Sequence, residues 1–321
     1  MEDTKKIINW SLENADLLSL KVEYYTGLRK IFPHIFDIGI FIEVEGKVSH
    51  GRGTDDFEEV AYAKALSEAL ERASINYFNI KNTNGLAVHF DIDSAKKNGR
   101  EELLERDAFL CHFLLGKGFI ERNPFNNKFN FEHLSNQNIS IKFFEMCRYQ
   151  DGVGILCIAN GESFKRPFGN IFGSAFGDNE EIVFKKAYIE VLRLVMHIKD
   201  KEIVSINLAK FKELEKYNFS DHGKLSLDLE YSKKINSFIN ENVLDMTKEV
   251  QSEDFQYEIL DLSLIPLPNL PLHIVWTRNF KLQNLFTGKS EETKINMKRL
   301  SQVSNCVIEF KNINSFPHPF D

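Results

Sequence analysis

The chain has 321 residues and a formal net charge of −7, which argues against a general nucleic-acid binder, because such a protein carries a basic face. A hydrophobic fraction of 43%, with 28 Phe, is sufficient for a sizeable, aromatic-rich core. No run approaches 18 apolar residues, and the N-terminal stretch lacks the apolar segment of a signal peptide. We therefore expect a cytoplasmic protein without a membrane span.

The cysteines are scattered, with no CxxC pair and no Cys/His cluster at zinc spacing. A disulfide framework is not expected in a chain of this size. We predict buried thiols of a reducing compartment at all four positions, namely Cys111, Cys147, Cys157 and Cys306.

In chain order, the first predicted elements are strands and long helices. A β-branched and aromatic run at 35–44 predicts a strand, and GRGTDD at 51–56 predicts a loop. A helix with an alanine-rich face is expected over roughly 57–79, followed by a turn and a short strand at 82–90. A second helix is expected from Asp93 to about Leu115, where GKG ends it.

The second half begins with a predicted β-hairpin, formed by the apolar runs at 139–149 and 153–160. FGSAFGDN at 172–179 predicts a glycine-rich connection into a third long helix at about 179–199. Helices and a surface excursion are expected over 200–255. Further strands are expected near 256–262, 272–277 and 305–310.

The order of these elements indicates the fold class. Helices and strands mix without regular βαβ alternation, so the prediction is α/β in the loose, α+β-like sense. No repeat of 20–50 residues and no interdomain linker is detected. Residues 1–321 are therefore expected to form a single domain, or two packed lobes.

Two of the predicted helices carry the same acidic motif, Glu-x-x-Glu-Arg. Residues i and i+3 share a helix face, so each motif pairs two carboxylates. The third helix places one more glutamate among apolar residues, where a carboxylate is costly unless it is paired or binds a cation. Three such helices pointing inward would form a Mg²⁺ site shared with substrate phosphates. The acidic residues are Glu68, Glu71, Glu102, Glu105 and Glu190.

Simpler interpretations of the same residues stay open. An ExxER motif on an exposed helix is commonly an ordinary intrahelical ion pair. The convergence of three helices in space is an assumption at this stage. GRG at 51–53 and FGSAFG at 172–177 could approach phosphates, but neither matches a P-loop or a dinucleotide-binding motif, so each is also consistent with a turn.

The chain resembles the YcaO superfamily, best known for ATP-dependent cyclodehydratases that modify ribosomally made peptides. The resemblance runs nearly end to end, and it implies a YcaO-type fold with three long acidic helices packed on mixed sheets. It is carried by YTGLRKIF at 25–32, GRGTDDFEEVAYAKALSEALER at 51–72, NTNGLAVHFDIDSAKKNGREELLERDAF at 82–109, FGSAFGDNEEIVFKKAYIEVLR at 172–193 and FPHPFD at 316–321.

The resemblance also implies roles for individual residues. The five glutamates would hold Mg²⁺ and, through it, the triphosphate of ATP. Five further residues would bind or adjoin the nucleotide, namely Lys64, Arg72, Asn84, Arg106 and Arg193. The proline-containing tail, 317–321, would reach the active centre through Pro317, Pro319 and Asp321.

The sequence departs from the family pattern at four of its positions. Lys64 stands where the family usually has Ser, and Arg193 stands where it usually has Gln. Val195 takes the place of an Arg, and Asp321 takes the place of the final Pro of the tail.

The implied reaction is formation of a thiazoline or oxazoline in a precursor peptide, as in bacteriocin maturation, with release of ADP and phosphate. Thioamide or amidine formation within the same fold is an alternative, as is a non-catalytic partner subunit of a peptide-modification complex. Little of the chain is left for a leader-peptide recognition domain, so a separately encoded recognition protein is expected. A homodimer is also expected, without nucleic-acid or membrane partners.

Overall fold

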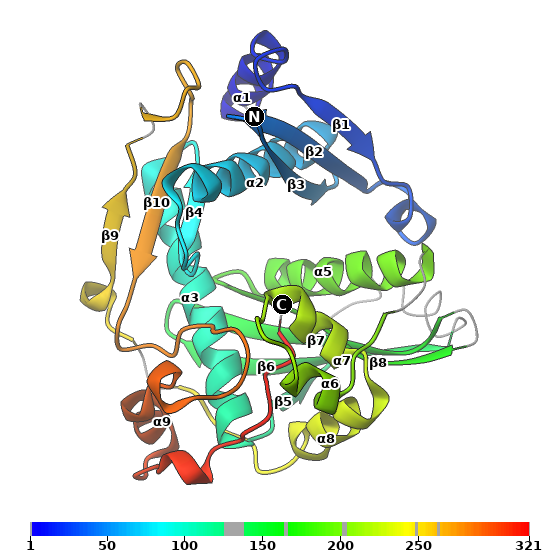
Figure 1. The fold of residues 1–321 in the computed structure, drawn as a ribbon, viewed down its shortest axis with the longest axis vertical. Coiled ribbons are helices and arrows are strands. Elements are labelled where there is room, and N and C mark those ends of the chain that lie inside the picture. The colour runs from blue at the N-terminus through cyan, green and yellow to red at the C-terminus, as the bar shows by residue number, and fades with distance from the viewer. Residues whose placement is uncertain are drawn as a thin grey trace. The chain divides into compact units, whose positions relative to one another are not determined.

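The computed structural model describes residues 2–124, 138–163, 166–200, 204–247, 250–261 and 264–320 (Figure 1). The chain divides into two compact units, each built from two separate stretches. Unit 1 consists of Met1–Arg100 and Phe255–Arg278, and unit 2 of Glu101–Asp254 and Asn279–Asp321. The chain passes from the first to the second inside helix α3 (Ile92–Leu115), which confirms the second predicted helix.

The described residues of unit 1 form two three-stranded antiparallel sheets, two α-helices that lie wholly within the unit and a short 3₁₀ helix. One sheet has the order β1-β2-β3, and the other has the order β4-β10-β9. The elements are α1 (Glu2–Glu13), β1 (Lys21–Tyr24), the short 3₁₀ helix η1 (Leu28–Lys30), β2 (Phe36–Val44), β3 (Lys47–Asp55), α2 (Glu58–Phe78), β4 (Leu86–His89), β9 (Gln256–Ile259) and β10 (His273–Arg278). The strands predicted at 35–44 and 272–277 and the turn and short strand predicted at 82–90 are thus confirmed. The strand predicted at 256–262 is confirmed as β9, and residue 262 lies outside the described residues.

Strand β3 and helix α2 pack unusually closely because two glycines of the strand face the helix. A Cβ atom on Gly51 would lie 2.0 Å from the backbone oxygen of Ala65, and one on Gly53 would lie 1.9 Å from that of Ala61. The alanine-rich face of α2 is buried, as predicted. The loop predicted at 51–56 is wrong, since its glycines are strand residues that let the helix approach.

Replacement of Gly51 by Ala is expected to lower the free energy of unfolding by about 1–3 kcal/mol, because the new methyl group overlaps the α2 backbone. Chemical denaturation of the purified protein measures this change. The control Val48→Ala alters a 63% exposed side chain in the same strand, so its effect is expected to stay near ±0.5 kcal/mol. Equal effects of the two substitutions would contradict the packing argument.

Unit 2 is centred on a four-stranded antiparallel sheet of order β5-β6-β7-β8. Helix α5 packs on one face, where Phe143 contacts Phe184, and α3 packs on the other, where Phe172 contacts Phe109. The elements are β5 (Ile120–Arg122), β6 (Ile139–Tyr149), β7 (Gly152–Ser163), β8 (Arg166–Gly177), α5 (Glu180–Asp200), α6 (Leu208–Lys212), α7 (Phe219–Ser226), α8 (Leu229–Ile239), η2 (Ser252–Asp254), η4 (Glu292–Lys294), α9 (Met297–Ser304) and η5 (Phe310–Asn312).

Unit 2 confirms the predicted hairpin and third helix and corrects three other predictions. The stretch 172–177 is part of β8 and not a glycine-rich connection. No strand forms over 305–310: Asn305 adopts a left-handed conformation that ends α9, and the amide of Ile308 donates to the Ser301 hydroxyl. Cys306 is exposed, whereas the other three thiols are buried as expected.

Two strand–helix segments of the chain are copies of one pattern. Residues 51–72 and 173–194 align without gaps at a constant offset of 122, with eight of the 22 positions identical. In each copy a glycine of the strand lies against the helix: Gly51 against Ala65, and Gly173 against Ala187. The two copies are 122 residues apart, a spacing well beyond the 20–50-residue period for which the sequence shows no repeat.

A buried ion pair ties the C-terminal stretch to α3 in unit 2. Arg299 of α9 contacts Asp107 with an N–O distance of 2.6 Å, and the two side chains are 1% and 0% exposed. The backbone amide of Gln283 also donates to Asp107, at 2.7 Å. Asp107 therefore organises residues that lie nearly 200 positions further along the chain.

Arg299→Met is expected to cost about 3–5 kcal/mol of unfolding free energy, because it leaves the Asp107 carboxylate buried without a counter-charge. The matched control, Lys233→Met, breaks an ion pair with Glu230 in which both side chains are more than 70% exposed. That pair is worth about 0–1 kcal/mol. Denaturant titration compares the two variants, and a loss in Arg299→Met no larger than in the control would contradict the anchoring role.

Among the described residues, no helix combines the length and the apolar character that crossing a bilayer requires.

Candidate functional site

Helix α2 of unit 1 presents the first acidic motif with its carboxylate already fixed. The backbone amide of Arg52 in β3 donates to Glu68 Oε2 at 2.9 Å, and Arg72 Nη2 donates to Glu68 Oε1 at 2.6 Å. Arg72 also donates to the backbone oxygen of His50 at 2.7 Å, which ties the helix to the strand. Glu71 lies one turn along on α2 and is half-buried.

The other two predicted residues of unit 1 have different surroundings. Lys64 is exposed, and its Nζ contacts Asp55 at 2.6 Å at the end of β3. Asn84 is buried, and its backbone oxygen accepts a hydrogen bond from the indole of Trp276 at 3.1 Å. Lys64 lies on helix α2 with Glu68. Asn84 is instead held by Trp276 of β10, in the second sheet of the unit.

In unit 2 two of the predicted carboxylates meet at one serine. The hydroxyl of Ser174 in β8 donates to Glu105 of α3 at 2.5 Å, and its backbone amide donates to Glu190 of α5 at 2.7 Å. Helices α3 and α5 pack on opposite faces of the sheet, and Ser174 lies in the strand between them. Two of the three acidic helices are thus brought together, through a residue that the sequence did not single out.

Glu105 lies in a setting that disfavours its charge. Burial raises the pKa of Glu105, and the Ser174 hydrogen bond and the charges of Arg106 and Lys186 partly offset this effect. One turn earlier, Glu102 forms an ion pair with Arg106 at 2.6 Å. A cation beside Glu105 would favour the ionised form further, because opposite charges nearby stabilise a carboxylate.

Glu190 differs from its expected environment. The neighbouring Tyr188, Val191 and Leu192 are buried, but Glu190 itself is exposed on α5, and Arg193 is half-buried. The apolar residues around Glu190 therefore face the sheet, and the Glu190 carboxylate lies on another side of helix α5. Its position is nevertheless restrained by the Ser174 amide.

The C-terminal tail is buried within unit 2 and packs on the acidic helix α3. Phe320 contacts the ring of Phe109 at a centroid distance of 4.8 Å, and the charge of Arg106 contributes to lowering the pKa of His318, after burial and the neighbouring His222. The backbone oxygen of Pro317 accepts from the Tyr231 hydroxyl, and Pro319 is buried. Asp321 lies outside the described residues.

The acidic residues offer a donor set of the kind that Mg²⁺ binds. The candidate ligands are carboxylates, and oxygen atoms are the ligands that Mg²⁺ prefers. Among residues 2–320 as far as they are described, no three His, Cys, Asp or Glu side chains are grouped closely enough to hold a metal by themselves. The chemistry fits an ion that completes its coordination with phosphate oxygens and water.

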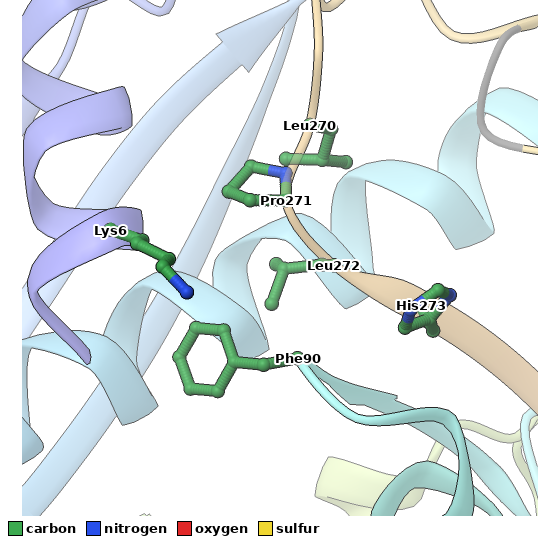
Figure 2. A pocket seen from close by; sticks show the side chains of 6 residues that line it. All are labelled: Lys6, Phe90, Leu270, Pro271, Leu272 and His273. Atoms are coloured by element: carbon green, nitrogen blue, oxygen red, sulfur yellow. The ribbon is translucent and has the colours of Figure 1, made fainter. Parts of the chain in front are cut away.

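A surface pocket of about 310 Å³ lies elsewhere in unit 1 and is unrelated to these residues (Figure 2). Four of the six lining residues are apolar and two are basic, and the Lys6 amine extends toward the ring of Phe90 (Figure 2). The residues that form it are Lys6, Phe90, Leu270, Pro271, Leu272 and His273. It offers no carboxylate and therefore no ligand for a hard cation.

Comparisons with known proteins give no match at the level of sequence: no family model matches the chain, and no curated protein does. Solved structures do match. A heterocyclase in complex with substrate and cofactor is 11% identical with a TM-score of 0.65, over 97% of this chain and 57% of that one. A YcaO from Methanopyrus kandleri, bound with AMPPCP and Mg²⁺, is 13% identical with a TM-score of 0.60, over 91% and 96%.

The chain has the YcaO fold. The predicted α+β-like fold class, with long helices packed on sheets, is therefore confirmed. The sheets were expected to be mixed, but every strand pair among the described residues is antiparallel. The heterocyclase TruD also matches, at 13% identity and a TM-score of 0.50, over 74% of this chain and 34% of that one. The chain thus spans little more than half the length of the first heterocyclase and about a third of the second.

Within this YcaO fold the C-terminal tail is secured by a pair of stacked histidines. The rings of His222 and His318 lie 4.1 Å apart at 12°. His222 Nε2 accepts from the amide of Gly288 at 2.8 Å, so its proton is on Nδ1, which donates to the backbone oxygen of His318. Burial lowers the pKa of His222, and a second proton would break the bond to Gly288.

Acidification is expected to destabilise the protein through His222. The pKa of His222 in the folded protein lies below the unfolded value of about 6.5. Below pH 6.5 the unfolded chain therefore binds a proton at this histidine that the folded protein does not bind, and protonation favours unfolding. The free energy of unfolding should therefore fall as the pH is lowered from 6.5 to 5, and His112 and His318, whose pKa values burial also lowers, should add to the fall. Denaturant titrations at pH 7 and 5 measure the difference.

The variant His222→Phe is expected to show a smaller difference between the two pH values, although it is less stable at pH 7. The control His34→Phe replaces a 67% exposed side chain and should retain the full difference. An unchanged pH dependence in His222→Phe would exclude this histidine as its source.

Proposed function

We propose that this protein is an ATP- and Mg²⁺-dependent enzyme that activates a backbone amide of a ribosomally made precursor peptide and forms a thiazoline or oxazoline. The observation that carries the proposal is the meeting of Glu105 and Glu190 at Ser174, on a fold shared with a YcaO that binds AMPPCP and Mg²⁺. The heterocyclase among the structural neighbours supports the choice of product.

The proposed Mg²⁺ ligands are the five glutamates of the acidic helices, namely Glu68, Glu71, Glu102, Glu105 and Glu190. The metal would neutralise charge that develops on the transferred phosphoryl group. Arg72 and Arg106 already pair with Glu68 and Glu102, and they fix those carboxylates while adding positive charge where a triphosphate needs it. Lys64, Asn84 and Arg193 are proposed nucleotide contacts.

The proposed reaction has two stages. A Cys, Ser or Thr side chain of the peptide loses its S–H or O–H proton and adds to the preceding carbonyl carbon. The resulting oxyanion attacks the γ-phosphorus of ATP, so that ADP leaves. Phosphate then leaves from the former carbonyl carbon, and loss of the amide proton gives the ring C=N bond. Positioning and charge neutralisation supply most of the rate in such chemistry.

The tail residues Pro317 and Pro319 and the C-terminal Asp321 are proposed to complete the active centre. The packing of Phe320 on Phe109, one turn beyond Arg106, supports this role because it keeps the tail against the acidic helix. A separately encoded leader-peptide recognition protein is proposed as a partner, and the protein is proposed to act as a homodimer.

A different function is favoured by the ion pairs themselves. Glu68–Arg72 and Glu102–Arg106 have the i,i+4 geometry of ordinary intrahelical pairs. On that observation the chain would be a non-catalytic YcaO-like partner, in which the acidic motifs only stabilise helices. This alternative predicts that neutralising Glu105 leaves nucleotide binding unchanged.

Calorimetric titration of Mg²⁺–ATP separates the two functions. Saturable binding is expected for the unmutated protein, and Glu105→Gln is expected to weaken it by about 10-fold or more, because the substituted amide cannot supply a carboxylate ligand. Glu230→Gln removes an exposed carboxylate on α8 and serves as the control, with affinity unchanged. Absence of binding by the unmutated chain, alone and with its proposed partner, would overturn the enzyme proposal.

A further inference from the structure

Ser174 makes polar contacts with two of the proposed metal ligands. Its hydroxyl donates to one proposed metal ligand, Glu105, and its backbone amide donates to another, Glu190. The two carboxylates come from helices on opposite faces of the sheet. One strand residue therefore sets the position of both.

The strand around Ser174 is built so that this arrangement is rigid. Ser174 is 6% exposed and lies within β8, where it pairs with Leu156 of β7. On one side, Gly173 lets α5 approach: a Cβ there would lie 2.7 Å from the backbone oxygen of Ala187. On the other side, Phe172 packs on Phe109 of α3. Sites on such strands hold side chains more precisely than sites on loops.

The duplicated segment in unit 1 shows which part of the arrangement is special to Ser174. Arg52 occupies the equivalent position, and its backbone amide donates to Glu68 as that of Ser174 does to Glu190. The Arg52 side chain, however, forms a bidentate pair with Asp37, which is buried. The amide contact is therefore common to both copies, whereas the bridge through the side chain belongs to Ser174.

The Ser174 hydroxyl and amide are neutral donors, so they orient the oxygens of the two carboxylates without changing their charge. The charges of Arg106 and Lys186 already act on Glu105. A bound cation would add to their effect, because opposite charges nearby stabilise a carboxylate.

We propose that Ser174 is a positioning residue of the Mg²⁺–nucleotide site, whose hydroxyl orients Glu105 and whose amide orients Glu190 toward a shared cation. This rests on the proposed function. Groups that orient metal ligands in this way typically contribute roughly 10- to 100-fold to metal affinity.

The test is the Mg²⁺ dependence of nucleotide binding, measured by calorimetry on the full chain with AMPPCP, which excludes turnover. Ser174→Ala keeps the amide and removes the hydroxyl, so it is expected to weaken Mg²⁺-dependent binding by roughly 10- to 100-fold. Ser174→Cys, which is near in size but a weak donor, should behave like Ala. It also provides the test if the alanine variant does not fold. Ser174→Thr retains the hydroxyl and should restore most of the affinity.

Two controls separate positioning from stability. Ser232→Ala removes a buried hydroxyl that accepts from the amide of Asn170 in the same strand and contacts no carboxylate, so it should leave affinity unchanged. In a Glu105→Ala background, Ser174→Ala should have no further effect, because the group that it orients is gone.

The outcomes distinguish this proposal from the one on which it rests. Binding by the unmutated chain that Ser174→Ala and Ser174→Cys leave intact would overturn the role of Ser174 and preserve the proposed function. An additive loss in the Glu105→Ala background would also overturn it. Absence of Mg²⁺–AMPPCP binding by the unmutated chain, alone and with its proposed partner, would overturn both.

Discussion

The candidate site depends on how closely a helix can approach a strand. A glutamate on a helix reaches the backbone amide of a strand only where no side chain separates the two elements. Gly51 and Gly173 remove that side chain, and each is followed directly by the residue whose amide fixes a carboxylate. The short distance between backbones is therefore the condition for a fixed carboxylate, and the acidic residues alone would not supply it.

This constraint explains why the motifs contain small residues as well as acids. The alanines of α2 and Ala187 of α5 lie opposite the glycines, and larger residues there would separate helix from strand. Glu68 and Glu190 each follow their glycine by 17 residues, which is the length of chain needed to end the strand and return along the helix. Packing and site geometry are thus encoded by the same positions.

Much of the fold could be predicted from the sequence, because long amphipathic helices and apolar hairpins have clear periodicity. The glycine-rich stretches at 51–56 and 172–177 were assigned to loops because glycine usually marks a turn. Here the tertiary contact with a helix outweighs that local preference. The strand expected at 305–310 does not form, because the local β preference has no tertiary contact to support it. Val307, for example, is 89% exposed.

The candidate site, too, could be predicted from the sequence only in part. The acidic residues could be found from helical spacing, but Ser174 could not, since a serine in a strand has no distinctive pattern. The similarity of residues 51–72 and 173–194 was the available signal, because it places Arg52 and Ser174 in equivalent positions. Asp107 was adjacent to a recognised motif, yet its partner Arg299 lies 192 residues away, beyond any local rule.

That separation has a consequence for synthesis of the chain. During synthesis, the ribosome adds a further 192 of the 321 residues after Asp107 before the counter-charge of this carboxylate exists. A nascent chain therefore carries an acidic helix whose buried side has no anchor, and non-local contacts of this kind form late. Unit 2 becomes fully stable only after its last stretch has been made, so a product cut short before Arg299 would present an uncompensated carboxylate to the cellular machinery that removes unfolded proteins.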